Sequence, residues 1–110
     1  MIKLVDGNHQ KKIDYTPTVD TDAGVVVLLG DTLTITSVDI LANQCGAVNW
    51  PNSGAQYSIT NPAGDAYALG AEIFADANSD ALPAGGLGRI GFVSRAAAAG
   101  DAEVRFVHER

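Results

Sequence analysis

The feature that most constrains the fold of this chain is a period of two in its apolar residues. In the stretch DTLTITSVDI, residues 31–40, Leu33 and Ile35 alternate with threonines, and Val38 continues the apolar side. This alternation predicts a β-strand that is buried on one face. Similar stretches predict further strands at 25–30, 46–50, 55–60, 71–76, 89–94 and 103–108.

The segments between these strands are rich in residues that favour turns. Asn, Pro, Gly, Ser and Asp gather at 51–54, 61–65, 78–80 and 99–101, and they either fix the backbone for a turn or tolerate a positive φ. No window of eleven residues carries a helical stripe of apolar side chains. We therefore expect an all-β fold, a small antiparallel β-barrel or sandwich.

The first fourteen residues differ from the rest of the chain. A short apolar cluster of Ile2, Leu4 and Val5 precedes a polar stretch that contains Lys11 and Lys12. The pattern is compatible with an N-terminal arm that reaches a neighbouring subunit or with a strand added to the fold. We expect residues 1–14 to form this arm or added strand and residues 15–110 to form a single β domain.

The distribution of charge restricts the partners. The 110 residues carry a net charge of −6, and from residue 16 onwards four arginines stand against eleven acidic residues. A surface of this kind repels a phosphate backbone, so we expect no nucleic-acid partner. No signal peptide and no apolar run long enough to cross a membrane is found, so we expect no membrane partner.

One short motif suggests a nucleotide site. GLGRIG, residues 86–91, matches G-x-G-x-x-G, which requires a buried strand before it and a helix after it. Turn residues precede it, and Gly100-Asp101 would end any helix at Ala96–Ala99 after about one turn. We therefore interpret the motif as a glycine-rich turn that leads into the strand at 89–94.

Motifs for a catalytic or metal site are incomplete. Asp76, Asn78 and Asp80 have the spacing of a calcium loop, but Ala81 and Leu87 occupy the positions that require glycine and glutamate. We therefore expect at most a weak surface site for a metal ion, and the simpler interpretation of these residues is a solvated turn. We assign no catalytic, cofactor or metal residue.

Cys45 is the only cysteine, so no disulfide can form within the chain. A cysteine nucleophile needs a histidine or another cationic partner, and His9 and His108 lie near opposite ends without a motif around them. We expect Cys45 to be a small buried side chain.

Three segments resemble a family of small phage-encoded proteins. They are DYTPTVDTDAGVVVLLGDTLTITSVDILANQCGAVNW (14–50), AGDAYALGAEIFAD (63–76) and GRIGFVSRAAAAGDAEVRFV (88–107). Members have been labelled recombinases of the RecA/RadA type, but that chemistry needs a phosphate-binding loop with its lysine, which this sequence lacks. The resemblance implies instead a capsid decoration, or cement, protein: a β-barrel, commonly a homotrimer, on the outside of an expanded head.

The resemblance also implies partners and a location. The partners are the major capsid protein and other copies of the chain, and the protein is made in the host cytoplasm and carried on the capsid exterior. The alternatives are a tail or head-completion protein and a small ligand-binding β domain that uses the turn at 85–91. The expected interface residues are Ile2, Leu4, Val5, Lys11, Lys12, Trp50 and Tyr57, with a core position as the alternative for Trp50.

Overall fold

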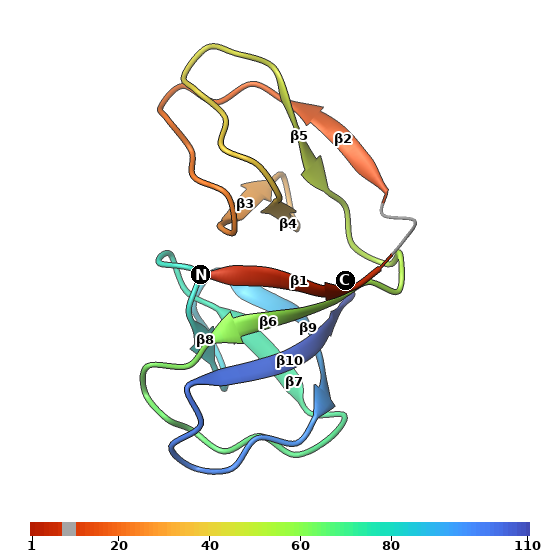
Figure 1. Ribbon diagram of the computed structural model, residues 1–110, viewed down its shortest axis with the longest axis vertical. Helices are drawn as coiled ribbons and strands as arrows, with labels where there is room; N and C mark the ends of the chain where they lie inside the picture. The colour runs from red at the N-terminus through yellow and green to blue at the C-terminus, as the bar shows by residue number, and fades with distance from the viewer. Residues whose placement is uncertain (8–10) are drawn as a thin grey trace.

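The protein is a two-layer sandwich of antiparallel β-sheets (Figure 1). The computed structural model describes residues 1–7 and 11–110, and over these ranges it contains ten strands and no helix. The sheets do not close into a barrel, so the all-β prediction is confirmed in its sandwich form. The larger sheet has the order β1 (Ile2–Asp6), β6 (Gln56–Thr60), β10 (Glu103–His108), β9 (Gly88–Arg95), β7 (Glu72–Ala75), β8 (Ala81–Leu82). The smaller sheet has the order β2 (Lys12–Tyr15), β5 (Gly46–Asn49), β4 (Thr32–Thr36), β3 (Val26–Leu29).

The alternating sequence pattern explains the core of the six-stranded sheet. In β10 the side chains of Val104 and Phe106 are buried and that of Arg105 is exposed, as the period of two predicts. Tyr57 and Ile59 of β6 lie opposite these two residues in the strand register and are buried with them. These side chains belong to one apolar cluster that also includes Leu33 and Ile35 of the four-stranded sheet, so both layers share a core.

The expectation of a half-buried strand at 31–40 is wrong for β4, which is buried on both faces. The side chains of Thr32, Thr34 and Thr36 are all buried. The Thr34 hydroxyl donates to the Val27 carbonyl at 2.8 Å, and the Thr36 hydroxyl donates to the Asp22 carbonyl at 2.8 Å. These hydrogen bonds replace those to water, which is why polar side chains can lie in the interior. The strand also ends earlier than expected, and Val38 is exposed beyond it.

Two buried hydrogen bonds join the sheets. The Asn49 amide nitrogen of β5 donates to the Tyr57 hydroxyl of β6 at 3.0 Å, and His108 Nε2 of β10 hydrogen-bonds the Leu33 carbonyl of β4 at 2.9 Å. The Tyr57 ring stacks on Phe106 and meets the His108 ring edge-on. Burial raises the pKa of Tyr57, and the hydrogen bond from Asn49 partly offsets this rise. The interface between the layers therefore has an aromatic and polar centre.

The first fifteen residues contribute one strand to each sheet. β1 lies at the edge of the six-stranded sheet and pairs with β6, with Ile2 opposite Ile59. β2 lies at the edge of the four-stranded sheet and pairs with β5, with Ile13 opposite Val48. β1 is thus an edge strand of the larger sheet, and the expected division into an arm or added strand at 1–14 and a domain at 15–110 stays a prediction.

Candidate interaction surface

The GLGRIG motif forms a turn that leads into a strand, as the sequence predicts. Gly86 has a φ of 61°, and a Cβ there would lie 2.5 Å from the Ala75 carbonyl oxygen. The Leu87 amide donates to the same carbonyl at 2.8 Å, and β9 begins at Gly88. A strand rather than a helix follows the turn, so the motif lacks the helix N-terminus that binds a pyrophosphate. Gly91 instead permits close approach to the β10 backbone, because a Cβ there would collide with the Val107 carbonyl oxygen.

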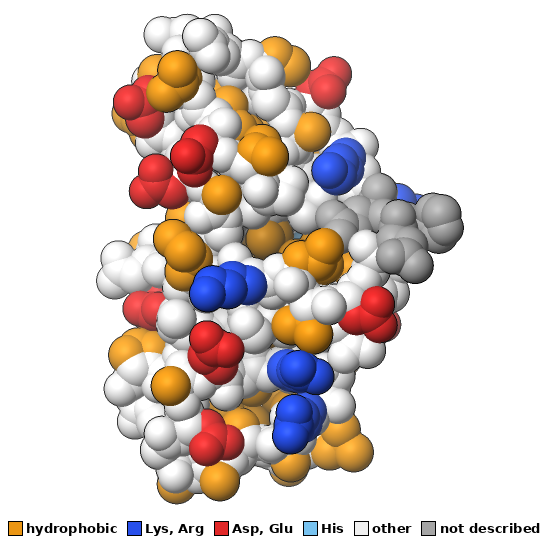
Figure 2. All heavy atoms as spheres, in the orientation of Figure 1, with side chains coloured by type: hydrophobic (Ala, Val, Ile, Leu, Met, Phe, Trp, Pro, Cys, Tyr) orange, Lys and Arg blue, Asp and Glu red, His pale blue; other side chains and the backbone are white. Residues whose placement is uncertain are grey.

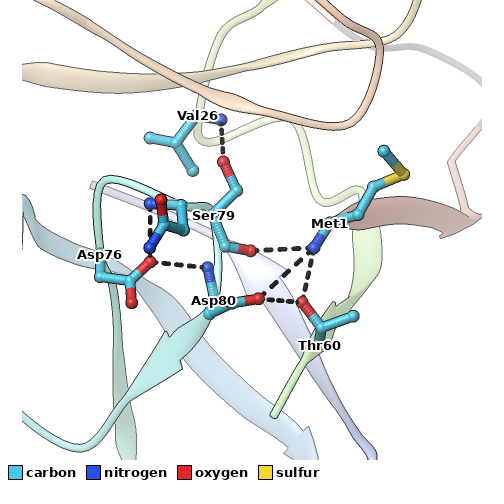
Figure 3. A network of polar contacts seen from close by, with 7 residues as sticks. Met1, Val26, Thr60, Asp76, Ser79 and Asp80 are labelled. Atoms are coloured by element: carbon cyan, nitrogen blue, oxygen red, sulfur yellow. Dashed lines mark hydrogen bonds and ion pairs between the residues drawn. The ribbon is translucent and has the colours of Figure 1, made fainter. Parts of the chain in front are cut away.

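The acidic segment 76–80 is held by hydrogen bonds of its own (Figure 3). The Asp76 carboxylate accepts the backbone amides of Asn78 at 2.9 Å and Asp80 at 3.0 Å, which shapes a tight turn. Asp80 faces the Thr60 hydroxyl and lies 3.7 Å from the Met1 ammonium group. Over residues 1–7 and 11–110, no group of three or more His, Cys, Asp or Glu residues is arranged to hold a metal ion.

The same turn connects the two sheets. The Ser79 hydroxyl accepts the Val26 amide of β3 at 2.8 Å, and the Ser79 carbonyl accepts a hydrogen bond from the Met1 ammonium group at 3.2 Å. Figure 3 shows these groups converging where β1 starts. The role visible here is structural, because the turn binds the start of β1 to both layers.

Cys45 is exposed, so the expectation of a buried side chain is wrong. It lies in the segment before β5, where Asn43 adopts a positive φ of 65° and turns the chain at the surface. Of the two histidines considered as partners, His108 is buried between the sheets, and His9 lies outside the described residues. The thiol therefore has no histidine partner in the part of the chain that the structure describes.

The residues expected at an interface fall into three groups. Ile2 and Tyr57 belong to the core and expose 3% and 2% of their surface, while Trp50 is intermediate between buried and exposed. Leu4 and Val5 are exposed on β1, by 49% and 39%. Lys11 and Lys12 are exposed beside β5 in the other sheet. Leu4 and Val5 are consecutive on β1 but line two separate hollows of the surface, and the two lysines lie on the other layer. The assignment of all seven residues to an interface stays a prediction.

Leu4 also lines a mainly apolar crevice between the sheets. The crevice has a volume of about 270 Å³ and is bordered by β1, by the chain around Gly24, and by Ile35, Asn49 and Tyr57. The Asn49 amide oxygen is buried and has no hydrogen-bond partner among the described residues. An exposed leucine at the mouth of such a crevice offers a contact point to another protein.

A basic row crosses the outer face of the six-stranded sheet, and sequence reasoning missed it. In the strand register Lys3 of β1 lies opposite Ser58 of β6, Ser58 opposite Arg105 of β10, and Arg105 opposite Arg95 of β9. Lys3, Arg105 and Arg95 are exposed, whereas Ser58 between them is only 7% exposed. Figure 2 shows Lys and Arg side chains on the face over β1, β6 and β10. The outward position of Arg105 was predictable, but the register that aligns the three cations was not.

Three members of the basic row border a surface hollow of about 380 Å³, whereas Lys3 lines the crevice between the sheets. Ser58, Arg105 and Arg95 line the hollow together with Val5 and the turn after β9, which supplies Ala96 and Ala97; Asp101 and Glu103 complete the wall. The lining of the hollow is mainly polar, unlike that of the crevice between the sheets. It joins the exposed apolar edge of β1 to exposed positive charge.

Taken together, the open β-sandwich, the glycine turn and the hydrogen-bonded acidic turn are features of a small structural protein. The family model described as phage cement protein matches residues 7–108, and the chain belongs to this family. No curated protein and no solved structure matches the chain.

Membership of this family gives the protein a structural role in a phage capsid and a place in the virion. The family is a class of structural proteins and not of enzymes. Among the described residues no helix is long and apolar enough to cross a membrane.

Proposed function

We propose that this protein is a decoration protein that binds the outer surface of an expanded phage head and stabilises it. The observation that carries the proposal is the family match over residues 7–108, which includes strands of both sheets and leaves out the first six and the last two residues of the chain. A head filled with DNA is under outward pressure. A protein that bridges neighbouring coat subunits opposes this pressure and needs no catalytic activity to do so. Bridging needs only a stable fold that presents contacts on more than one side.

The surface offers such contacts. β1 and β8 end the larger sheet, and β2 and β3 end the smaller one, so four strands have an unpaired edge within the described fold. Exposed edges readily pair with another chain. We propose that β1, with Leu4 and Val5, contacts the major capsid protein, that Lys11 and Lys12 form ion pairs across an interface, and that the half-buried Trp50 adds an apolar contact. Ile2 and Tyr57 support this surface from the core.

The proposal includes assembly into a homotrimer. Val19, Leu41 and Val38 are exposed by 67%, 55% and 53% in the two loops that flank the four-stranded sheet. These loops are bound to each other, since Thr21 and Ile40 exchange backbone hydrogen bonds of 2.8 Å. Contacts between copies through such apolar side chains would add stability to a small core.

Electron cryomicroscopy of heads that lack the protein, before and after addition of the purified chain, tests this function. We expect new density on the outside of expanded heads, arranged with the symmetry of the shell, and a higher temperature for DNA release. Density confined to the tail or the head–tail junction would contradict the proposal and favour a tail or head-completion protein.

A further inference from the structure

The basic row concentrates positive charge on one face of an acidic protein. Three of the seven Lys and Arg residues of the chain lie on it, although the net charge is −6. Lys3, Arg105 and Arg95 form no ion pair with any residue in 1–7 or 11–110. By contrast, Arg89 on the same sheet is paired with Glu72 at 3.7 Å and lies over the Phe92 ring. Within the described part of the chain the three cations of the row therefore have no ion-pair partner, although Asp101 and Glu103 line the hollow beside the two arginines.

The register places two of these cations in direct opposition. Arg105 and Arg95 are partners on adjacent strands, which lie about 5 Å apart, and such like-charged pairs destabilise a sheet. Lys3 lies two strands away from Arg105, at a backbone separation of about 10 Å, with the small side chain of Ser58 between them. An anionic group in this gap would relieve the repulsion and would meet cations from both sides.

The surroundings identify the kind of anion. Asp101 and Glu103 line the same hollow, so a long polyanion such as nucleic acid would meet negative charge as soon as it left the row. Separate carboxylates on a peptide fit better, because the arginine guanidinium group binds a carboxylate through two parallel hydrogen bonds. Val5, Ala96 and Ala97 in the wall can contact the aliphatic parts of such a segment.

We propose that the basic row formed by Lys3, Ser58, Arg105 and Arg95 is a docking site for an acidic segment of a partner protein. The inference deepens the proposed function, on which it rests for the identity of the partner: the segment then belongs to the capsid surface. Asp and Glu side chains of the segment lie along the row, one between Lys3 and Arg105 above Ser58 and one at the Arg105–Arg95 pair.

The first test uses the full chain and a fluorescein-labelled hexaglutamate peptide, with binding followed by fluorescence anisotropy. We expect saturable binding that weakens as NaCl rises from about 50 to 500 mM, because exposed charges are screened. Arg105→Gln and Arg95→Gln should each weaken it by about tenfold, the effect of one lost charge-assisted contact. Arg110→Gln removes the same charge at an exposed position outside the row and should leave binding unchanged.

Folding of each variant is checked by its thermal midpoint, which should stay the same or rise for Arg105→Gln and Arg95→Gln as repulsion is removed. Absence of peptide binding, or equal loss in Arg110→Gln, would overturn the proposal. So would tighter binding of an oligothymidylate of equal charge, since it would indicate a phosphate site.

The second test measures pelleting of the wild type and of the double variant Arg105→Gln/Arg95→Gln with expanded heads. If the wild type binds heads and the affinity of the double variant is at least ten times lower, the row is the docking site. If that variant binds heads as tightly as the wild type, the capsid docking site lies elsewhere and the proposal is wrong. If the wild type itself does not bind heads, the proposed function fails, and the peptide titration still decides whether the row binds carboxylates.

Discussion

His108 Nε2 lies 2.9 Å from the Leu33 carbonyl oxygen, across the interface between the two sheets. Because a carbonyl only accepts hydrogen bonds, Nε2 carries the proton and the ring is held as that tautomer. The other nitrogen, Nδ1, is buried and has no partner among the described residues. The histidine is therefore built into the sandwich as a neutral ring, and a second proton on it would be buried without an acceptor.

The stability of the fold should fall when the pH drops below about 6.5, the ordinary pKa of histidine. Burial lowers the pKa of His108 in the folded protein, and the Leu33 hydrogen bond only partly offsets this. Below pH 6.5 the unfolded chain therefore binds more protons than the folded one, so stability decreases until the pH passes the lowered pKa. Urea unfolding between pH 8 and 5 measures this, with His108→Gln as the control. An equal pH dependence in the variant would contradict the assignment.

Tyr57→Phe should destabilise the protein by about 1–3 kcal/mol. The Tyr57 hydroxyl accepts the Asn49 amide at 3.0 Å, and without it a buried donor loses its partner. The stack with Phe106 is kept, so the fold itself should survive. Unfolding in urea, followed by the fluorescence of Trp50, gives the difference in free energy. A change below about 0.5 kcal/mol, the usual range for surface substitutions, would show that this hydrogen bond contributes little.

Gly91→Ala should be destabilising by about 1–3 kcal/mol or more, since the added methyl group would be forced against the Val107 carbonyl and separate β9 from β10. Gly30→Asn is the matched control. Gly30 lies in an open turn with a φ of 60°, where nothing is near an added Cβ and asparagine tolerates the backbone. Thermal unfolding of the two variants compares them. Similar midpoints would mean that the sheet can relax around residue 91.

Thr36→Val should cost about 1–3 kcal/mol although it keeps the shape of the side chain. The Thr36 hydroxyl donates to the Asp22 carbonyl at 2.8 Å and accepts the Val25 amide at 3.0 Å, and valine can do neither. Thr18→Val, at an exposed position, should change stability little. Equal effects in chemical denaturation would contradict the role assigned to the buried hydroxyl.

The strands were predictable where buried and exposed side chains alternate along the strand. β10 shows this best, because Val104 and Phe106 face the core and Arg105 faces solvent in simple alternation. β4 was misjudged because its threonines are polar, and their burial depends on carbonyl partners in distant segments that a sequence does not reveal. The two-residue β8 was missed because it is too short to show a period.

The candidate surface was less predictable than the fold. The exposure of Leu4 and Val5 depends on β1 being an edge strand, and the position of a strand in a sheet cannot be predicted from its local sequence pattern. Ile2 was expected at an interface as part of the N-terminal arm or added strand and Tyr57 as an aromatic anchor; both are buried in the core, and their part in an interface stays a prediction. The basic row depends on the register of four strands, of which β1 and β6 lie far from each other and from β9 and β10 in the sequence.

Co-sedimentation of the purified protein with expanded heads that lack it, with bound copies counted against the coat protein, tests the central claim most directly. A decoration protein should saturate at a large copy number fixed by the symmetry of the shell. Binding at only a few copies per particle, or none by a folded protein, would contradict the claim.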